Sequence, residues 1–165
     1  MALRKSGKNA LIQLVEVIAT VEQTPFDISG VGTDGRSRAN QFSFTIEGTV
    51  VDANGYNQPY TEPVPVGQSR VSGSLTVYYN VTADETNDLL WEIYEGQHDP
   101  ASCTDPADYT IRIMLEGDCA DKELWSITGF VIENLDIQMP YDNLMMIALN
   151  WRAWVPTRTT IAAGE

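Results

Sequence analysis

Apolar and polar residues alternate along much of this chain, with the two-residue period of β-strands that bury one face. The alternation predicts strands over residues 41–50, 72–80, 109–115 and 123–137. Residues 10–21 alternate poorly, but Val and Ile dominate them and no helix cap precedes them, so we expect a strand there too. Residues 143–154 are apolar on both faces, and we expect that strand to be covered from both sides.

Two of these strands have clearly different faces. Their apolar face carries Phe42, Phe44, Ile46, Leu75, Val77 and Tyr79. Their opposite face is small and polar or acidic, with Ser43, Thr45, Glu47, Ser74 and Thr76. Period two alone does not tell which surroundings each face meets.

The period changes to that of a helix after residue 80. Thr82 and Glu85 have capping-box spacing, and Gly96 is placed to end the helix, so we predict a helix over about residues 83–95. Its apolar stripe includes Leu89, Leu90 and Ile93. Its charged face consists of Asp84, Glu85, Asp88, Glu92 and Glu95.

The remaining segments are expected to be loops. Residues 30–40 are Gly-rich, and residues 51–70 form a long Pro-rich connection, a length that usually means function or disorder. Its apolar residues include Tyr56, Tyr60, Val64 and Val66. An acidic, solvated loop starts at Gln97-His98-Asp99, and the tail from residue 155 is expected to be loose, or an arm that orders on contact.

Six strands and one helix indicate a mainly β fold. We expect an antiparallel β-sandwich or partly open barrel with one flanking helix. The 165 residues are enough for a single domain with a real core, so we assign residues 1–165 to one domain with N- and C-terminal arms.

The net charge of −13 makes DNA or an anionic membrane an unfavourable binding partner, although an acidic surface can let DNA pass. Twelve of the 23 acidic residues lie between residues 84 and 123. The basic and apolar start imitates a signal peptide, but Gln13 and Glu16 interrupt it, so we expect it to be the mature N-terminus. No apolar stretch approaches the roughly 20 residues of a membrane span.

The sequence offers little catalytic chemistry. His98 is the single histidine, and no phosphate-loop, dinucleotide-binding or zinc-protease motif occurs. We therefore expect no enzymatic activity, no cofactor and no metal.

Cys103 and Cys119 flank the strand over residues 109–115, without further partners at metal-site spacing. They are either free thiols or members of a disulfide within or between subunits. The ends of the intervening strand are on the order of 20 Å apart, whereas a disulfide needs Cα atoms within about 7 Å. If the cysteines are oxidised, we expect the link to join two chains.

The order of elements resembles the major tail tube proteins of tailed bacteriophages and related contractile injection systems. The resemblance covers roughly residues 40–154 and is carried by "SGSLTVYY", the helix ending in "YEG", "YTIRIML", "LWSITGFVIENLDIQ" and "NLMMIALNWRAWV". It implies a structural virion protein of the tail, assembled in the host cytoplasm, whose copies form stacked hexameric rings around a channel for DNA delivery. It also implies partners besides the chain itself, namely a sheath, a tape-measure and a tail terminator protein.

The resemblance suggests roles for the residues singled out above. The polar strand face (Ser43, Thr45, Glu47, Ser74 and Thr76) becomes a candidate channel lining, past which DNA moves without specific binding. Loop 51–70 becomes a candidate for stacking rings, and the acidic helix face becomes an outer surface. The alternative is a secreted or adhesive β-sandwich that binds carbohydrate through exposed Tyr and Trp.

Overall fold

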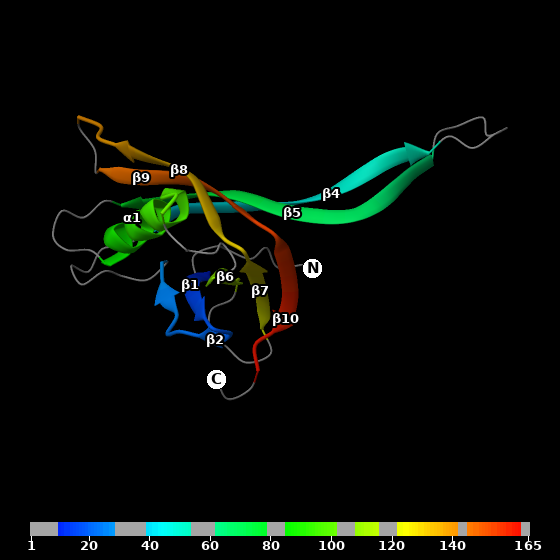
Figure 1. Cartoon of the computed structure of the whole chain (residues 1–165), viewed down its shortest axis with the longest axis horizontal. Coiled ribbons are helices and arrows are strands. Elements are labelled where there is room, and N and C mark those ends of the chain that lie inside the picture. The colour runs from blue at the N-terminus through cyan, green and yellow to red at the C-terminus, as the bar shows by residue number, and fades with distance from the viewer. Residues whose placement is uncertain are drawn as a thin grey trace, which may run out of the picture.

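The computed structural model describes residues 10–28, 39–53, 62–78, 85–101, 108–115, 122–141 and 145–162. Within them lie ten strands and one helix (Figure 1). The first five strands are β1 (Leu11–Ile18), β2 (Val21–Glu22), β3 (Phe26–Asp27), β4 (Ala39–Ala53) and β5 (Glu62–Tyr78). The helix α1 (Glu85–His98) follows, and then come β6 (Tyr109–Met114), β7 (Glu123–Thr128), β8 (Val131–Gln138), β9 (Met146–Ala153) and β10 (Val155–Thr160).

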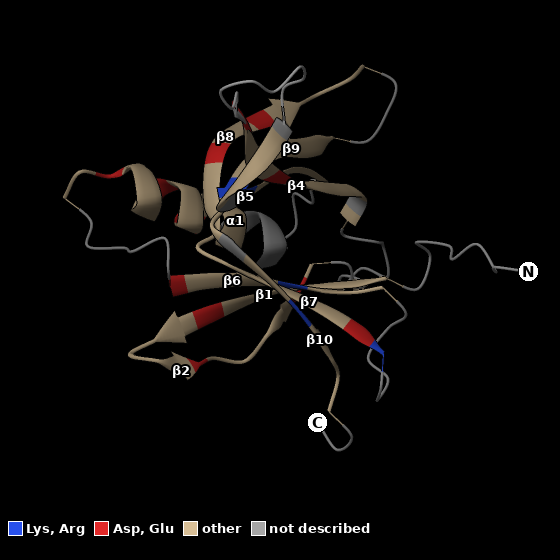
Figure 2. Cartoon of the chain, turned by 90° about the vertical axis from the view of Figure 1, so that its right-hand side faces the viewer, with Lys and Arg blue, Asp and Glu red and all other residues tan. Residues whose placement is uncertain are grey.

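The strands form two antiparallel sheets, which confirms the mainly β fold with one helix. One sheet has four strands in the order β4-β5-β9-β8. The other has the order β10-β7-β6-β1-β2, and β3 also pairs with β1. Figure 2 shows the two sheets as separate layers, with α1 at one side of them.

The chain passes between the sheets at two neighbouring corners. Gly129 leads from β7 to β8 with a φ of +74°, a conformation that costs glycine little. Trp154 lies between β9 and β10. A Cβ added to Gly129 would be only 2.7 Å from the nearest atom of the Trp154 indole, so this corner also leaves no room for a side chain. The strand predicted over residues 123–137 is therefore two strands. The prediction of a loose tail from residue 155 is wrong for residues 155–160, because they form β10 and pair with β7.

The core lies between the sheets. Trp151 is fully buried and stacks on Phe42 with ring centroids 5.8 Å apart. On α1, Leu90 and Ile93 are buried and Leu89 packs against the same cluster, which confirms the predicted helical stripe. The helix was predicted to end at Gly96, but it continues to His98.

The prediction of a long loop over residues 51–70 is wrong for most of its length. Residues 51–53 extend β4 and residues 62–70 belong to β5, and the two strands pair as a hairpin that projects from the rest of the chain (Figure 1). Register shifts interrupt β4 between Gly48 and Val50, and Gly67 of β5 has a φ of +77°. Irregularities of this kind bend and twist a β-ribbon locally, and the projecting hairpin is bent in Figure 1.

The composition of residues 143–154 suggested a strand covered on both faces, but β9 is covered on one face only. Ile147, Leu149, Trp151 and Ala153 are buried, whereas the alternating Asn150 and Arg152 are exposed. The sheet therefore has one buried and one open face.

Candidate functional site

The open face of the four-stranded sheet is built from the polar positions of all four strands. Ser43 on β4 is paired with Ser74 on β5, Ser74 with Asn150 on β9, and Asn150 with Asn134 on β8. One row of small polar side chains thus crosses the whole sheet. The hydroxyls of Ser43 and Ser74 are hydrogen bonded at 2.8 Å.

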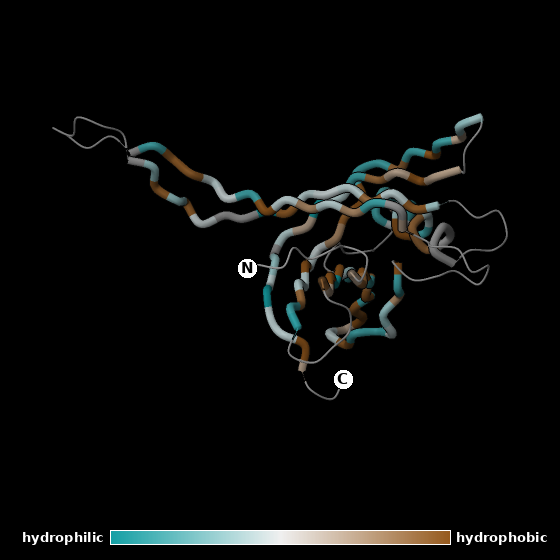
Figure 3. Tube along the Cα trace, turned by 180° about the vertical axis from the view of Figure 1, so that it is seen from behind, coloured by the Kyte–Doolittle hydropathy of each residue, from teal (hydrophilic) through white to brown (hydrophobic). Residues whose placement is uncertain are grey.

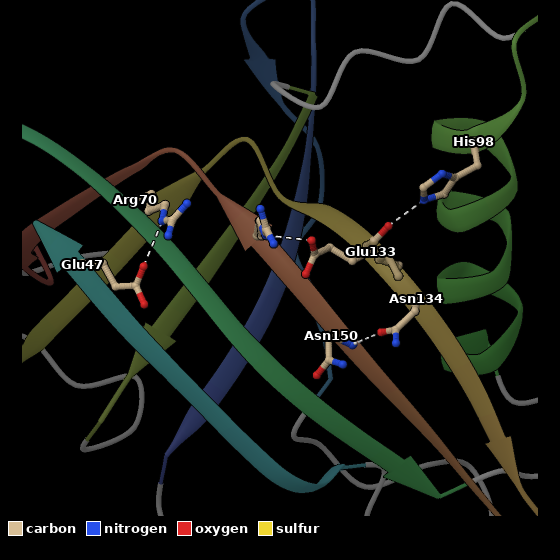
Figure 4. Close-up of polar contacts among 8 residues, drawn as sticks. Glu47, Arg70, His98, Glu133, Asn134 and Asn150 are labelled. Carbon is tan, nitrogen blue, oxygen red and sulfur yellow. Dashed lines mark hydrogen bonds and ion pairs between the residues drawn. The ribbon is translucent and has the colours of Figure 1, made fainter. Parts of the chain in front are cut away.

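Two ion pairs lie on this face (Figure 4). Arg70 Nε and Glu47 Oε2 are 2.8 Å apart, and Arg152 Nε and Glu133 Oε1 are 2.7 Å apart. All four side chains are exposed to solvent, so each pair is expected to contribute less than about 1 kcal/mol to folding. Their main effect is on charge, because each guanidinium has a carboxylate directly beside it.

The polar face is hollowed between β4 and β9. Its lining residues are Ser43, Thr45, Glu47, Arg70, Ser72, Gly73, Ser74, Glu133, Asn150, Trp151 and Arg152. Among the described residues, no group of three or more His, Cys, Asp or Glu side chains is arranged to hold a metal ion. This face therefore presents hydroxyls, amides and paired charges.

The structure brings the predicted polar residues together on this one face. Ser43, Thr45 and Glu47 are exposed on β4, and Ser74 and Thr76 are half-buried on β5. Sequence reasoning missed Arg70, Asn134, Asn150 and Arg152. The alternation in "LNWRAW" was a usable signal for Asn150 and Arg152, but the high apolar content of that strand masked it.

Both edge strands of this sheet expose apolar residues on the opposite, core-facing side. Ile46 of β4 is 39% exposed and Ile137 of β8 is 42% exposed, although each is paired with a fully or nearly fully buried residue of the next strand. Among the described residues, no further strand pairs with β4 or β8 on its outer side. Free edges with exposed apolar side chains favour pairing with another strand.

The projecting half of the β4–β5 hairpin carries exposed apolar residues as well. Val50, Val51, Val64 and Val66 are each between 43% and 58% exposed. Figure 3 shows these apolar stretches on both strands of the hairpin. Tyr56 and Tyr60, the other apolar residues predicted there, lie outside the described residues.

The remaining predicted residues are partly described. Glu92 and Glu95 are exposed on α1, and acidic residues recur on α1, β1 and β8 while Lys and Arg are few (Figure 2). Asp84, Cys103 and Cys119 lie outside the described residues, as do the side chains of Glu85 and Asp88. The described helix is too short or too polar to cross a membrane.

The prediction of a solvated loop at Gln97 and His98 is wrong. Both residues belong to the end of α1. Gln97 Oε1 accepts the N–H of Ile132 in β8, and His98 Nε2 bonds to the carbonyl oxygen of the same residue. The nearby Tyr109 has its pKa raised above the ordinary 10.0, mainly by burial and further by the carboxylates of Glu16, Asp108 and Glu92.

No protein-family model and no curated protein matches this sequence. Solved structures do match it. A chain from the tail of an empty gene transfer agent (GTA) particle, with C6 symmetry, has a TM-score of 0.64 at 12% identity and covers 96% of this chain and 100% of its own. The chain has a tail tube fold.

Two further structures support this assignment of the fold. The SPP1 tail tube has a TM-score of 0.60 at 9% identity, over 97% of this chain and 81% of that one. A chain of the PVC sheath–tube complex, from an extracellular contractile injection system in its extended state, has a TM-score of 0.61 at 11% identity, over 96% of this chain and 93% of that one. The tail tube fold thus spans nearly the whole chain.

Proposed function

We propose that this chain is a structural subunit of a tail tube in a virion or a related injection particle. Copies join into rings, and the polar face of the β4-β5-β9-β8 sheet lines a channel through which DNA is delivered. The observation that carries this proposal is the four-stranded sheet itself, which has one open polar face and, in the part of the chain that the structure describes, no further strand beside β4 or β8.

Strand direction supports ring closure through those edges. Adjacent strands in the sheet are antiparallel throughout, so β4 and β8, three positions apart, run in opposite directions. The β4 strand of a second copy, placed beside β8, then continues the antiparallel order with the polar face on the same side. A closed ring of this kind leaves no free edge in the sheet.

The channel lining would have a low affinity for DNA. Affinity for DNA comes largely from Lys and Arg that neutralise phosphates, and both described arginines of this face are already paired with carboxylates. The sheath, tape-measure and terminator proteins would be further partners, and the exposed acidic residues of α1 would lie outside. The role is structural, without catalysis.

Electron microscopy of the purified protein tests the proposal, with rings or tubes as the expected result. Ile137→Asp should prevent ring closure while leaving a folded subunit, because it places a charge on the apolar side of the β8 edge. Val21→Asp is the matched control, since Val21 is 61% exposed on the other sheet and should not affect rings. Dispersed wild-type monomers would contradict the proposal and favour the carbohydrate-binding alternative.

A further inference from the structure

The edge of β8 is not equally free along its length. At its start, Gln97 of α1 donates from Nε2 to the carbonyl oxygen of Phe130 at 2.8 Å and accepts from the N–H of Ile132 at 2.9 Å. His98 Nε2 lies 2.7 Å from the carbonyl oxygen of Ile132. Because a carbonyl oxygen only accepts, this ring nitrogen carries the proton and donates. Figure 4 shows His98 pointing from α1 to β8.

These side chains bond the backbone of β8 as a neighbouring strand would. The Gln97 amide offers one donor and one acceptor, the pair that a strand residue offers to its partner. The buried Leu90 and Ile93 fix α1 in place. A strand from another subunit would have to displace both Gln97 and His98 before it could pair with Ile132.

The pairing of β8 with β9 becomes irregular immediately after Ile132. A register shift lies between Ile132 and Asn134, and there the Asn134 side-chain oxygen accepts the N–H of Asn150 at 3.1 Å. Regular pairing with β9 then continues to Gln138. Within the described residues, the hydrogen bonds from α1 to β8 end at Ile132.

We infer that Gln97 and His98 form a stop that sets the position of a second copy's β4 on β8, so that pairing begins beyond Ile132. The inference rests on the proposed assembly through these edges. The stop would fix the register between the two strands, which the alternation of polar and apolar faces fixes only in part. A shift of β4 along β8 by one residue is excluded, because it exchanges the polar and apolar faces of β4. A slip of two residues keeps both faces and moves one subunit by about 6.8 Å, at about 3.4 Å per residue.

Hydrogen exchange on the wild-type protein tests the stop directly. The Ile132 amide is already bonded in the single subunit, so its exchange should be unchanged by assembly. Amides in the segment from residue 133 to residue 138 should exchange more slowly in tubes, by at least about tenfold for those that gain a partner. Slowing that includes Ile132, or no slowing in the segment that follows, would overturn the inference.

The variant Gln97→Ala/His98→Ala tests the consequence. With the stop removed, tubes should show more than one helical lattice in electron micrographs, whereas wild-type tubes should show one. Glu92→Ala/Glu95→Ala is the matched control, because it changes two exposed residues of the same helix that do not reach β8 through these bonds.

The outcomes separate the two proposals. A folded double variant that forms tubes with the single wild-type lattice would overturn the stop and leave the proposed function intact. Wild-type protein that forms neither rings nor tubes would overturn both. If the double variant does not fold, the exchange pattern of the wild-type tubes decides alone.

Discussion

Arg70 and Glu47 are joined across the β4–β5 hairpin, with 2.8 Å between Nε and Oε2, on the open face of the four-stranded sheet. The pair places a positive and a negative charge together where the proposed channel would pass DNA. Removing the carboxylate therefore changes the charge of this face without changing its shape.

The variant Glu47→Gln should release Arg70 to contact phosphates and slow the release of DNA from particles. The slowing should be greatest at low salt, because each phosphate contact steepens the salt dependence of binding by a slope of about 0.9. The measurement is the rate of DNA release at two salt concentrations. Glu47→Gln/Arg70→Gln is the control and should restore the wild-type rate. Identical rates for all three proteins would argue against a channel-lining position.

The exposed valines of the projecting hairpin should join one ring to the next. Val64→Thr/Val66→Thr keeps β-branched side chains but adds hydroxyls, so the hairpin should still form while its contact with a neighbour weakens. We expect single rings or short tubes in electron micrographs. Replacing the hairpin beyond Thr49 by an Asn-Gly turn should abolish polymerisation of a folded subunit.

The matched control for the hairpin is Ile18→Thr/Val21→Thr. These residues are 52% and 61% exposed on the six-stranded sheet, so the same chemical change occurs away from the hairpin. Long tubes from the hairpin variant, equal in length to those of this control, would count against ring stacking by the hairpin.

Gly73 should tolerate no side chain. A Cβ at this position would lie 2.5 Å from the Trp151 ring, which is fully buried and surrounded by aromatic residues. We expect Gly73→Ala to lower the free energy of unfolding by about 1–3 kcal/mol, measured by urea denaturation. Gly48→Ala is the control, since nothing lies within 4 Å of its added Cβ. Equal stability of the two variants would contradict the packing described.

The raised pKa of Tyr109 predicts a loss of stability at alkaline pH. Above the ordinary value of 10.0 the unfolded chain releases the phenolic proton before the folded chain does. Stability from this group is therefore complete below pH 10 and decreases as the pH rises through the folded-state pKa. Tyr109→Phe should remove this part of the decrease in denaturation experiments at pH 9 to 11. A slope equal to that of the wild type would show that Tyr109 does not contribute.

Local alternation was sufficient to predict the faces of the central strands. Phe42 and Phe44 pack on the core while Ser43 and Thr45 are exposed, because period two follows from the strand backbone itself. The helix and its buried Leu90 and Ile93 were predictable for the same reason, from a period of 3.6 residues.

The first part of β5, which contains prolines, was expected to be a loop, and β10 was expected to be a loose tail or an arm. Pro63 and Pro65 indicate a loop. Within the described residues, however, β5 pairs with β9 over Val71–Tyr78 and not along its projecting part, and a strand edge without a partner tolerates proline. Pro156 is accommodated similarly in β10, the edge strand of the other sheet. Which edges are free depends on the whole arrangement of strands.

The sequence by itself thus determined which residues of the central strands and of the helix share a face, because side-chain direction along a strand or helix is a local property. Only the tertiary structure decided that Arg70 meets Glu47, that Arg152 meets Glu133, and that Gln97 reaches the backbone of β8. These partners are far apart along the chain, and their contacts depend on the order of strands and on how the helix packs beside them. Neither is encoded in the period of any single segment.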